Sequence, residues 1–166
     1  MNPRSVVVMG VAGAGKSTVG SALARALAAT FLDADSFHPP ENLAKMQSGT
    51  PLNDLDRTGW LTALRCELDR REALGERVVL ACSALKQRYR DALGLDATAR
   101  ATVFLELSPE VATLRLQARS EHFMPPSLVA SQFEALEPPE HALCVDATLP
   151  VNVIVASVVK ALAERA

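Results

Sequence analysis

A glycine-rich stretch near the N-terminus, GVAGAGKST at residues 10–18, constrains the fold of this chain more than any other feature. It follows the apolar run SVVVM (5–9) and leads into TVGSALARALAA (18–29), where apolar residues recur at helical spacing. Glycines let the backbone wrap tightly, so its N–H groups can point inward at phosphate oxygens, and the positive end of a following helix favours the same anion. We therefore expect a strand, a phosphate-binding loop and a helix, in this order.

The stretch matches the pattern G-x-x-x-x-G-K-[ST], which is typical of loops that cradle the phosphates of ATP or GTP. Lys16 is expected to reach the β- and γ-phosphates and to act in catalysis, and the hydroxyl of Ser17 is expected to ligate Mg²⁺. A plain glycine-rich turn is the alternative, but chance gives such a match in roughly one chain in a hundred. The predicted nucleotide-binding residues of the loop are Gly10, Val11, Ala12, Gly13, Ala14, Gly15, Lys16, Ser17 and Thr18.

Strand-like and helix-like segments alternate along the chain. Helical patterns separate the apolar runs, and the longest of these patterns covers 53–75. Near-continuously apolar strands that alternate with helices indicate a parallel sheet covered on both faces. We predict one α/β domain over residues 1–166, built as a three-layer sandwich. The expected strands are 5–9, 30–35, 77–82, 101–107 and 142–147.

Composition limits the partners of the chain. A net charge of −2 provides no overall field that would attract nucleic acid or anionic lipid. No apolar stretch approaches the roughly 20 residues of a membrane span, and the N-terminal apolar run leads into the glycine loop rather than a cleavage site. The three cysteines fit neither a disulfide framework nor a metal site, and we expect Cys82 and Cys144 to be reduced core residues. These features favour a cytoplasmic protein without nucleic-acid or membrane partners.

Two carboxylates end the second expected strand. Ligands of open α/β sheets bind outside the carboxyl ends of the strands, so Asp33 and Asp35 should face the phosphate loop. Phosphoryl transfer needs a carboxylate that orients or deprotonates the acceptor hydroxyl, and oxygen ligands for magnesium. We assign the first, catalytic role to Asp35 and the metal role to Asp33; the alternative is a pair of turn-forming aspartates. His38 either contacts the substrate or caps the next helix, and Trp60 is expected to pack rather than stack.

Basic residues form two groups. Arg115 and Arg119 end a helical pattern just before the loop SEHFMPP (120–126). An arginine on a mobile loop can neutralise charge that develops during phosphoryl transfer, although arginines at a helix C-terminus also complement the helix dipole. We favour a catalytic role for Arg119 and leave both possibilities open for Arg115. The other group lies near the start of the 53–75 helix and after the third strand: Arg57, Lys86, Arg88 and Arg90.

Other phosphate-binding proteins fit the sequence less well than a small kinase. The sequence D-R-T-G at 56–59 matches a GTPase motif, but it lies in a helical pattern, and N-K-x-D occurs nowhere in the chain. Motor and transport ATPases normally need a larger body. A kinase for a small molecule or a nucleotide suits this length best.

Several segments together resemble the gluconokinases of the shikimate-kinase-like P-loop group. The resemblance covers about 6–146, and its combination of motifs is more specific than the phosphate loop alone. The motifs are D-x-D-x-x-H-P, P-L-x-D-x-D-R, C-S-A-L-K-x-x-Y-R-D and H-F-M-P. The segments are GVAGAGKST, FLDADSFHPPENLAKMQSGTPLNDLDRTGWL, ACSALKQRYRD, RLQARSEHFMPPSLVASQFEALEPP and CVDA.

The resemblance implies a reaction and an architecture. The reaction is transfer of the γ-phosphate of ATP to the 6-hydroxyl of D-gluconate, which gives 6-phosphogluconate, with Mg²⁺ as cofactor. The architecture is a P-loop NTPase sheet of five parallel strands in the order 2-3-1-4-5, with a lid at about 119–127, in a homodimer. Arg119 would be the lid arginine on the phosphates, and Arg115 would lie by the adenine.

The resemblance also suits the charges found above. Gluconate is a polyol that ends in a carboxylate, so its site needs cations at some distance from Asp35. We expect these substrate contacts from Arg57, Lys86 or Arg90, with His38 as a further contact.

Some positions depart from the usual pattern of the resembled family. Ala34 stands where glycine is common, Gly59 where proline usually precedes the tryptophan, and Glu121 where glycine usually precedes H-F-M. None of these changes removes a proposed catalytic group.

Two alternatives stay open. The first is a related kinase for shikimate or a nucleoside monophosphate, although shikimate kinases usually carry G-G-G where this chain has C-S-A-L-K. The second is a nucleotide-binding protein that has lost its chemistry. The joint presence of Lys16, Ser17, Asp35 and Arg119 counts against the second alternative.

Overall fold

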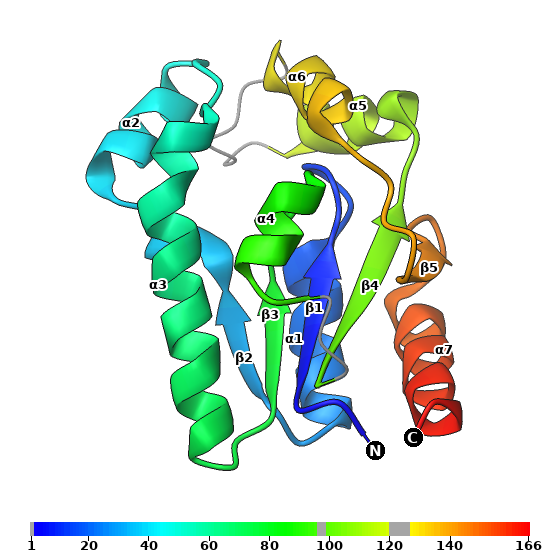
Figure 1. Ribbon diagram of the computed structural model, residues 1–166. Coiled ribbons are helices and arrows are strands. Elements are labelled where there is room, and N and C mark those ends of the chain that lie inside the picture. Colours follow the sequence, from blue (N-terminus) through cyan, green and yellow to red (C-terminus); the bar gives the residue numbers. More distant parts are fainter. Residues whose placement is uncertain (1, 96–98, 120–126) are drawn as a thin grey trace.

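The computed structural model describes residues 2–95, 99–119 and 127–166, and its centre is a parallel sheet with helices on both faces (Figure 1). All strand pairs are parallel, and the order is β2-β3-β1-β4-β5, which confirms the order implied by the resemblance. The strands are β1 (Ser5–Met9), β2 (Thr30–Asp33), β3 (Val78–Ala81), β4 (Arg100–Glu106) and β5 (Leu143–Asp146).

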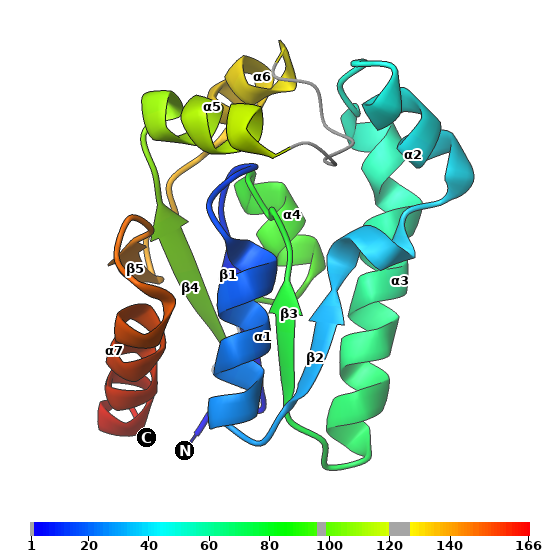
Figure 2. The same cartoon turned by 180° about the vertical axis from the view of Figure 1, so that it is seen from behind.

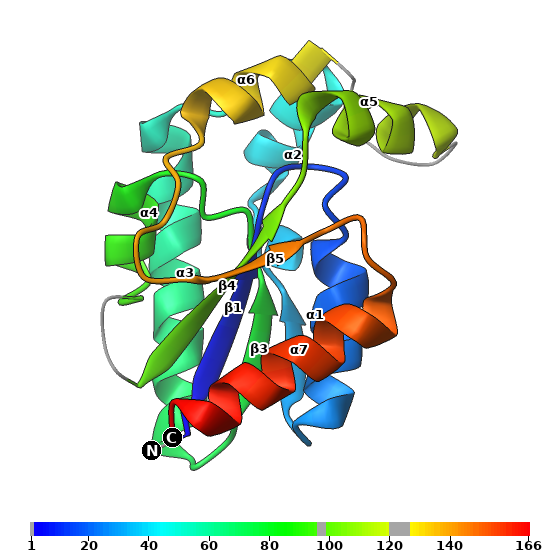
Figure 3. The ribbon, with the colours of Figure 1, turned by 90° about the vertical axis from the view of Figure 1, so that its right-hand side faces the viewer.

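The helices divide between the faces and the carboxyl edge of the sheet. One face carries α1 and α7, which lie against each other in Figure 3, and the opposite face carries α3 and α4 (Figures 1 and 2). Near the carboxyl ends of the strands lie α2, α5 and α6 (Figure 1). The helices are α1 (Lys16–Ala26), α2 (Pro40–Gln47), α3 (Asp54–Ala73), α4 (Gln87–Ala92), α5 (Pro109–Ala118), α6 (Ser127–Ala135) and α7 (Val151–Glu164), with a 3₁₀ turn η1 (Ala34–Phe37).

The central strand β1 is buried along its whole length because both of its faces are covered. Val6 and Val8 pack with α1 and α7, whereas Val7 and Met9 pack with α3 and α4. Side chains alternate between the faces of a strand, so one apolar run supplies both layers of the core. Within the described residues, no helix combines the length and the apolar character needed to cross a membrane.

The ends of α3 are set by local sequence. Asn53 is the N-cap, and its side chain accepts a hydrogen bond from the backbone N–H of Asp56, whose carboxylate accepts one from the N–H of Asn53 in return. This reciprocal capping satisfies two amide groups that the first turn leaves without partners. At the other end, Gly75 has a φ of 80° and stops the helix, as its sequence position predicts.

The segment after β3 differs from its predicted form. The sequence favours a helix from Ser83, but α4 begins only at Gln87. Ala84 has a φ of 45°, a left-handed conformation that breaks a helix. The guanidinium of Arg90 holds this turn, because Nη1 donates to the carbonyls of Ala84 at 2.8 Å and Leu85 at 3.1 Å.

Arg90 also fastens a distant part of the chain to the same turn. Its Nη2 donates to the carbonyl of Glu137 at 2.8 Å, and the backbone N–H of Glu137 donates to Leu85 at 2.8 Å. The residue is 3% exposed, and burial lowers its pKa from the ordinary arginine value. Arg90 therefore joins the β3–α4 connection to the segment that follows α6.

One prediction about the core was wrong. Cys82 is buried, and burial raises the pKa of its thiol to about 12, as expected of a core cysteine. Cys144 is exposed, although it lies in an apolar run. The reason is that β5 is an edge strand, where Val145 points into the core and Cys144 points the other way.

Replacing Arg90 with methionine should destabilise the fold, because it leaves buried carbonyls without donors. We expect the free energy of unfolding to fall by about 2–4 kcal/mol in urea denaturation. The matched control is Arg88→Met on the same helix, whose side chain is 66% exposed, and which should change the free energy by less than about 1 kcal/mol. Equal effects of the two changes would contradict the structural role of Arg90.

Candidate functional site

A cleft of about 670 Å³ lies at the carboxyl edge of the sheet, where the phosphate loop, η1, α3, the β3–α4 connection and the α5–α6 region meet. Gly10, Val11 and Ala14 belong to the same loop but lie outside this lining, and the side chains of Val11 and Ala14 are in the core. The predicted site residues that line the cleft are Ala12, Gly13, Gly15, Lys16, Ser17, Thr18, Asp35, His38, Arg57, Lys86 and Arg119.

Glycine is required at two places in the phosphate loop. Gly13 has a φ of 85°, and a Cβ there would lie 3.2 Å from the carbonyl of Ala112 in α5. Gly15 has a φ of 89° and is the N-cap of α1, which begins at Lys16 without a side-chain cap. The amides of the first turn of α1 are therefore left for an anion, which is the geometry of a phosphate site.

Two side chains from elsewhere in the chain hold the loop. Arg115 donates from Nη1 to the carbonyl of Gly13 at 3.1 Å and from Nη2 to that of Ala147 at 2.8 Å. The N–H of Ala12 donates to Oε1 of Gln132, at 2.6 Å. Sequence reasoning missed Gln132, because nothing in its local pattern indicates that α6 packs onto a loop 120 residues away.

Lys16 folds back along the loop, and its ammonium group donates to the carbonyl of Val11 at 2.9 Å. Burial lowers the pKa of Lys16, and the carboxylates of Asp35 and Asp33 oppose this shift. An anion that enters the cleft would stabilise the charged form of this part-buried ammonium group and raise its pKa again.

Ser17 and Asp33 form the expected oxygen pair. The Ser17 hydroxyl donates to Oδ2 of Asp33 at 2.7 Å, and Oδ1 of Asp33 accepts the backbone N–H of Asp35 at 3.0 Å. Hydroxyl and carboxylate oxygens are the ligands that Mg²⁺ prefers, so this pair fits that ion. Across the described ranges, no group of three or more His, Cys, Asp or Glu side chains could hold a metal ion alone. Phosphate oxygens would have to complete the coordination.

Asp35 lines the cleft from η1, directly after β2. Its pKa is raised, first because surrounding protein atoms remove water from the carboxylate and second because Asp33 carries the same charge, while Lys16 acts in the opposite direction. A carboxylate whose pKa is raised accepts a proton more readily than an ordinary aspartate does.

Two cations, Arg57 and Lys86, form another wall of the cleft around the ring of Tyr89. The guanidinium carbon of Arg57 lies 5.2 Å from the ring centroid, and Nζ of Lys86 lies 5.7 Å from it. Nζ of Lys86 is 3.1 Å from Oδ1 of Asp54, and the Tyr89 hydroxyl donates to the same carboxylate. These bonds and the Arg88 guanidinium lower the pKa of Asp54, so one carboxylate holds several donors in place. Nothing in the local sequence pattern singles out Asp54 as a site residue.

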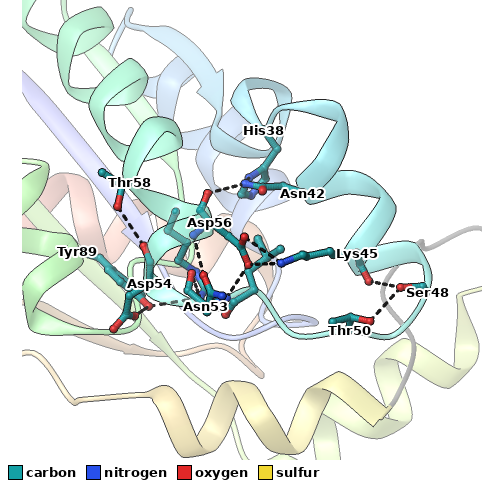
Figure 4. Close-up of polar contacts among 12 residues, drawn as sticks. His38, Asn42, Lys45, Ser48, Thr50, Asn53, Asp54, Asp56, Thr58 and Tyr89 are labelled. Atoms are coloured by element: carbon teal, nitrogen blue, oxygen red, sulfur yellow. Dashed lines mark hydrogen bonds and ion pairs between the residues drawn. The ribbon is translucent and has the colours of Figure 1, made fainter.

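His38 and Trp60 also line the cleft, whereas Asn42, next to His38 (Figure 4), is not part of the lining. The rings of His38 and Trp60 are stacked, with centroids 4.1 Å apart and an interplanar angle of 16°. Trp60 is 3% exposed, and its Nε1–H donates to the carbonyl of Ala34 at 2.7 Å. Trp60 thus packs, as predicted, but it also stacks on a cleft residue.

Outside the phosphate loop, three predicted site residues are not part of this lining. Arg90 and Arg115 direct their guanidinium groups to backbone carbonyls, and Asp33 meets the site only through Ser17 and Asp35. Arg119 lines the cleft at the end of α5. Most of the predicted lid, including Glu121 and the H-F-M segment that follows it, lies outside the described residues.

Comparisons with known proteins identify the family of the chain. The family model for shikimate kinase matches residues 12–138. A probable gluconokinase of Xenopus tropicalis is 44% identical, and the match covers 92% of this chain and 90% of that protein. The thermoresistant gluconokinase of Escherichia coli is 40% identical, with coverage of 93% and 90%.

A crystal structure of a gluconokinase from Sinorhizobium meliloti 1021 superimposes with a TM-score of 0.87 at 45% identity, covering 99% of this chain and 94% of that one. Shikimate kinase from Aquifex aeolicus shares the fold, with a TM-score of 0.61 at 20% identity. The chain therefore belongs to the gluconokinases, a family of P-loop kinases within the shikimate-kinase-like group.

Proposed function

We propose that this protein phosphorylates D-gluconate at its 6-hydroxyl at the expense of ATP. The observation that carries the proposal is that a single cleft combines a phosphate loop, a carboxylate beside it and a pair of cations. Gluconate presents a matching sequence of groups, with a terminal hydroxyl at one end and a carboxylate at the other.

The phosphate loop binds the triphosphate of ATP. The amides that follow Gly15, in the first turn of α1, donate hydrogen bonds to phosphate oxygens, and Lys16 turns from the carbonyl of Val11 to the β- and γ-phosphates. Ser17 and Asp33 would hold Mg²⁺, which supplies charge neutralisation on the phosphates when it is bound.

Asp35 acts on the acceptor. Its carboxylate accepts a hydrogen bond from the 6-hydroxyl, aims the oxygen at the γ-phosphorus and takes the proton as the new bond forms. The terminal P–O bond of ATP breaks in the same transfer, so ADP leaves with the bridging oxygen. The raised pKa of Asp35 makes it a better proton acceptor for this step.

Arg57 and Lys86 receive the carboxylate of the sugar acid. Both lie in the cleft and both are held at the ring of Tyr89. Bonds between a charged donor and a carboxylate are about twice as strong as neutral ones, which gives this end its selectivity. Arg90, which the sequence also indicated, has no part in the proposal because its donors bind backbone carbonyls.

We also propose the parts of the scheme that rest on family likeness. The chain acts as a single cytoplasmic domain in a homodimer, and a lid at about 119–127 closes over bound ATP. Arg119 then meets the phosphates, and Arg115 lies by the adenine while it braces Gly13.

A coupled ADP-release assay tests the proposed activity. The panel contains D-gluconate, related sugar acids, shikimate and nucleoside monophosphates, each with ATP and Mg²⁺. We expect the highest kcat/KM for D-gluconate. A higher kcat/KM for shikimate or a nucleotide would mean that this compound, and not D-gluconate, is the acceptor. ATP binding without turnover of any acceptor would identify a nucleotide-binding protein without kinase activity.

Replacing Asp35 with asparagine should abolish most activity without loss of stability. We expect kcat to fall by at least about a hundredfold, because the amide cannot take the proton, whereas ATP affinity by calorimetry stays close to that of the wild type. The control is Asp91→Asn, which changes an exposed carboxylate on α4. Near-normal turnover of Asp35→Asn would contradict the catalytic role.

The same variant should show a pH-dependent gain in stability. The pKa of Asp35 is higher in the folded than in the unfolded chain, so its ionised form costs stability at neutral pH. Asp35→Asn should therefore unfold at a temperature equal to or above that of the wild type at pH 7. This advantage should disappear below the pKa of the unfolded aspartate, about 3.9, as measured by thermal unfolding across pH.

Replacing Lys86 with methionine should weaken gluconate binding selectively. Loss of a charged donor predicts a gluconate KM at least about tenfold higher, with a much smaller change in the KM for ATP. Arg88→Met is the control, since Arg88 binds the same Asp54 at 2.6 Å but is not part of the cleft lining. A larger change in the KM for ATP would mean that the acceptor site is wrongly placed.

A further inference from the structure

One nitrogen of the His38 ring faces a group that decides where the ring carries its proton. Nδ1 of His38 lies 3.2 Å from Nδ2 of Asn42 in α2. In the part of the chain that the structure describes, no hydrogen bond is found for the other ring nitrogen, Nε2, and the residue lines the cleft. Stacking on Trp60 fixes the plane of the ring, so Nε2 is the polar atom that His38 can offer to a ligand.

The orientation of the Asn42 amide follows from a second contact. Asn42 is 3% exposed, and its Nδ2 lies 2.9 Å from the backbone carbonyl oxygen of Asp56 in α3 (Figure 4). A carbonyl oxygen only accepts, so the NH₂ end of the amide must face Asp56. The second hydrogen of this NH₂ group then points to Nδ1 of His38, which must accept it and be unprotonated.

The ring of His38 is neutral at physiological pH. Burial lowers its pKa to about 4, and the positive charge of Arg57 acts in the same direction. A neutral imidazole carries one proton, and Asn42 has excluded it from Nδ1, so the proton is on Nε2.

We propose that Asn42 is a positioning residue, which holds His38 as the neutral Nε2–H tautomer and so gives the cleft one uncharged donor for a hydroxyl oxygen of the acceptor. The identity of the acceptor as a polyol acid rests on the proposed function. The donor is uncharged, so it does not compete with Arg57 and Lys86 for the carboxylate. It selects a hydroxyl instead.

The same assembly sets the position of this donor relative to Asp35. The His38 ring stacks on Trp60, and Trp60 is bonded to the carbonyl of Ala34, the residue before Asp35. The hydroxyl bound by His38 therefore lies at a fixed distance along the polyol from the hydroxyl that reacts. This arrangement discriminates among sugar acids by the configuration of an internal hydroxyl, which a carboxylate receptor alone cannot do.

Nitrogen NMR of the free protein tests the tautomer directly. The chain has three histidines, so with ¹⁵N-histidine labelling the His38 signals are assigned by their loss in His38→Gln. We expect a protonated Nε2 and an unprotonated Nδ1, unchanged between about pH 8 and pH 5.5. In Asn42→Asp the new carboxylate only accepts, so Nδ1 should become protonated. A proton on Nδ1 in the wild type, or titration near the ordinary histidine pKa of about 6.5, would overturn the proposal.

Kinetics test whether the tautomer matters for the acceptor. Loss of one neutral hydrogen bond predicts a gluconate KM about three- to tenfold higher in Asn42→Asp, with the KM for ATP unchanged. His38→Gln removes the ring and with it any tautomer for Asn42 to select. In that background Asn42→Asp should cause no further rise in KM. If Asn42 only braces α2 against α3, the rise would persist there, and the proposal would fail.

Lys45→Met is the matched control for bracing. Lys45 lies on the same helix and forms an ion pair with Asp56 at 2.9 Å, and no hydrogen bond or ring contact between Lys45 and His38 is found among the described residues. We expect it to leave the gluconate KM unchanged; a rise equal to that of Asn42→Asp would overturn the proposal. Thermal unfolding of each variant verifies that it is folded, and the NMR measurement on the wild type requires no variant to be active.

Failure of the tautomer assignment and failure of the proposed function can be distinguished. The tautomer is measured without substrate, so it holds or fails whatever acceptor the protein uses. If the acceptor panel identifies a compound other than gluconate, the proposed function fails, and the KM comparison is made with that compound.

Discussion

The burial of β1 on both faces is the constraint on which the rest of the structure depends. A strand covered on both sides needs a helix layer on each face, which α1 with α7 and α3 with α4 supply. Because every strand runs parallel to β1, all carboxyl ends lie at one edge of the sheet. The phosphate loop, the aspartates at the end of β2 and the cationic segment after β3 therefore converge there.

At this edge, buried polar groups hold the reactive ones in place. Arg90 fixes the turn that carries Lys86, Asp54 holds Lys86 at the ring of Tyr89, and Trp60 anchors the His38 ring near Asp35. Asp35 and Lys16, to which we assign catalytic roles, are ionised at a cost, since the pKa of Asp35 is raised and that of Lys16 is lowered. This cost lowers stability, and in the proposed scheme a bound phosphate or hydroxyl reduces it.

The sequence predicts those features that depend on local pattern. Apolar periodicity and the glycine loop are sufficient to predict the strands, the sheet class and the loop conformation. The position of Asp33 at the end of β2 is sufficient to predict that it faces the phosphate loop, where it meets Ser17. Features that depend on packing between distant parts of the chain cannot be predicted from local sequence patterns. Nothing local distinguishes Arg90, whose carbonyl partner Glu137 is 47 residues away, from a basic residue that faces a substrate. The role of Asn42 is likewise not visible in the sequence, because its contact with Asp56 forms only when α2 packs on α3.

The distribution of charge explains how a chain with a net charge of −2 can select an anionic substrate. No overall field draws the sugar acid in, so selection must come from local groups whose positions are fixed before binding. The cleft has positive groups at Lys16 and at the Arg57–Lys86 pair, with Asp35 and the neutral His38 ring also lining it. A protonated His38 would add a further cation and let a carboxylate bind in the wrong direction. In the proposed scheme, the low pKa of this ring thus favours a single orientation of the acceptor, with its hydroxyl end at Asp35.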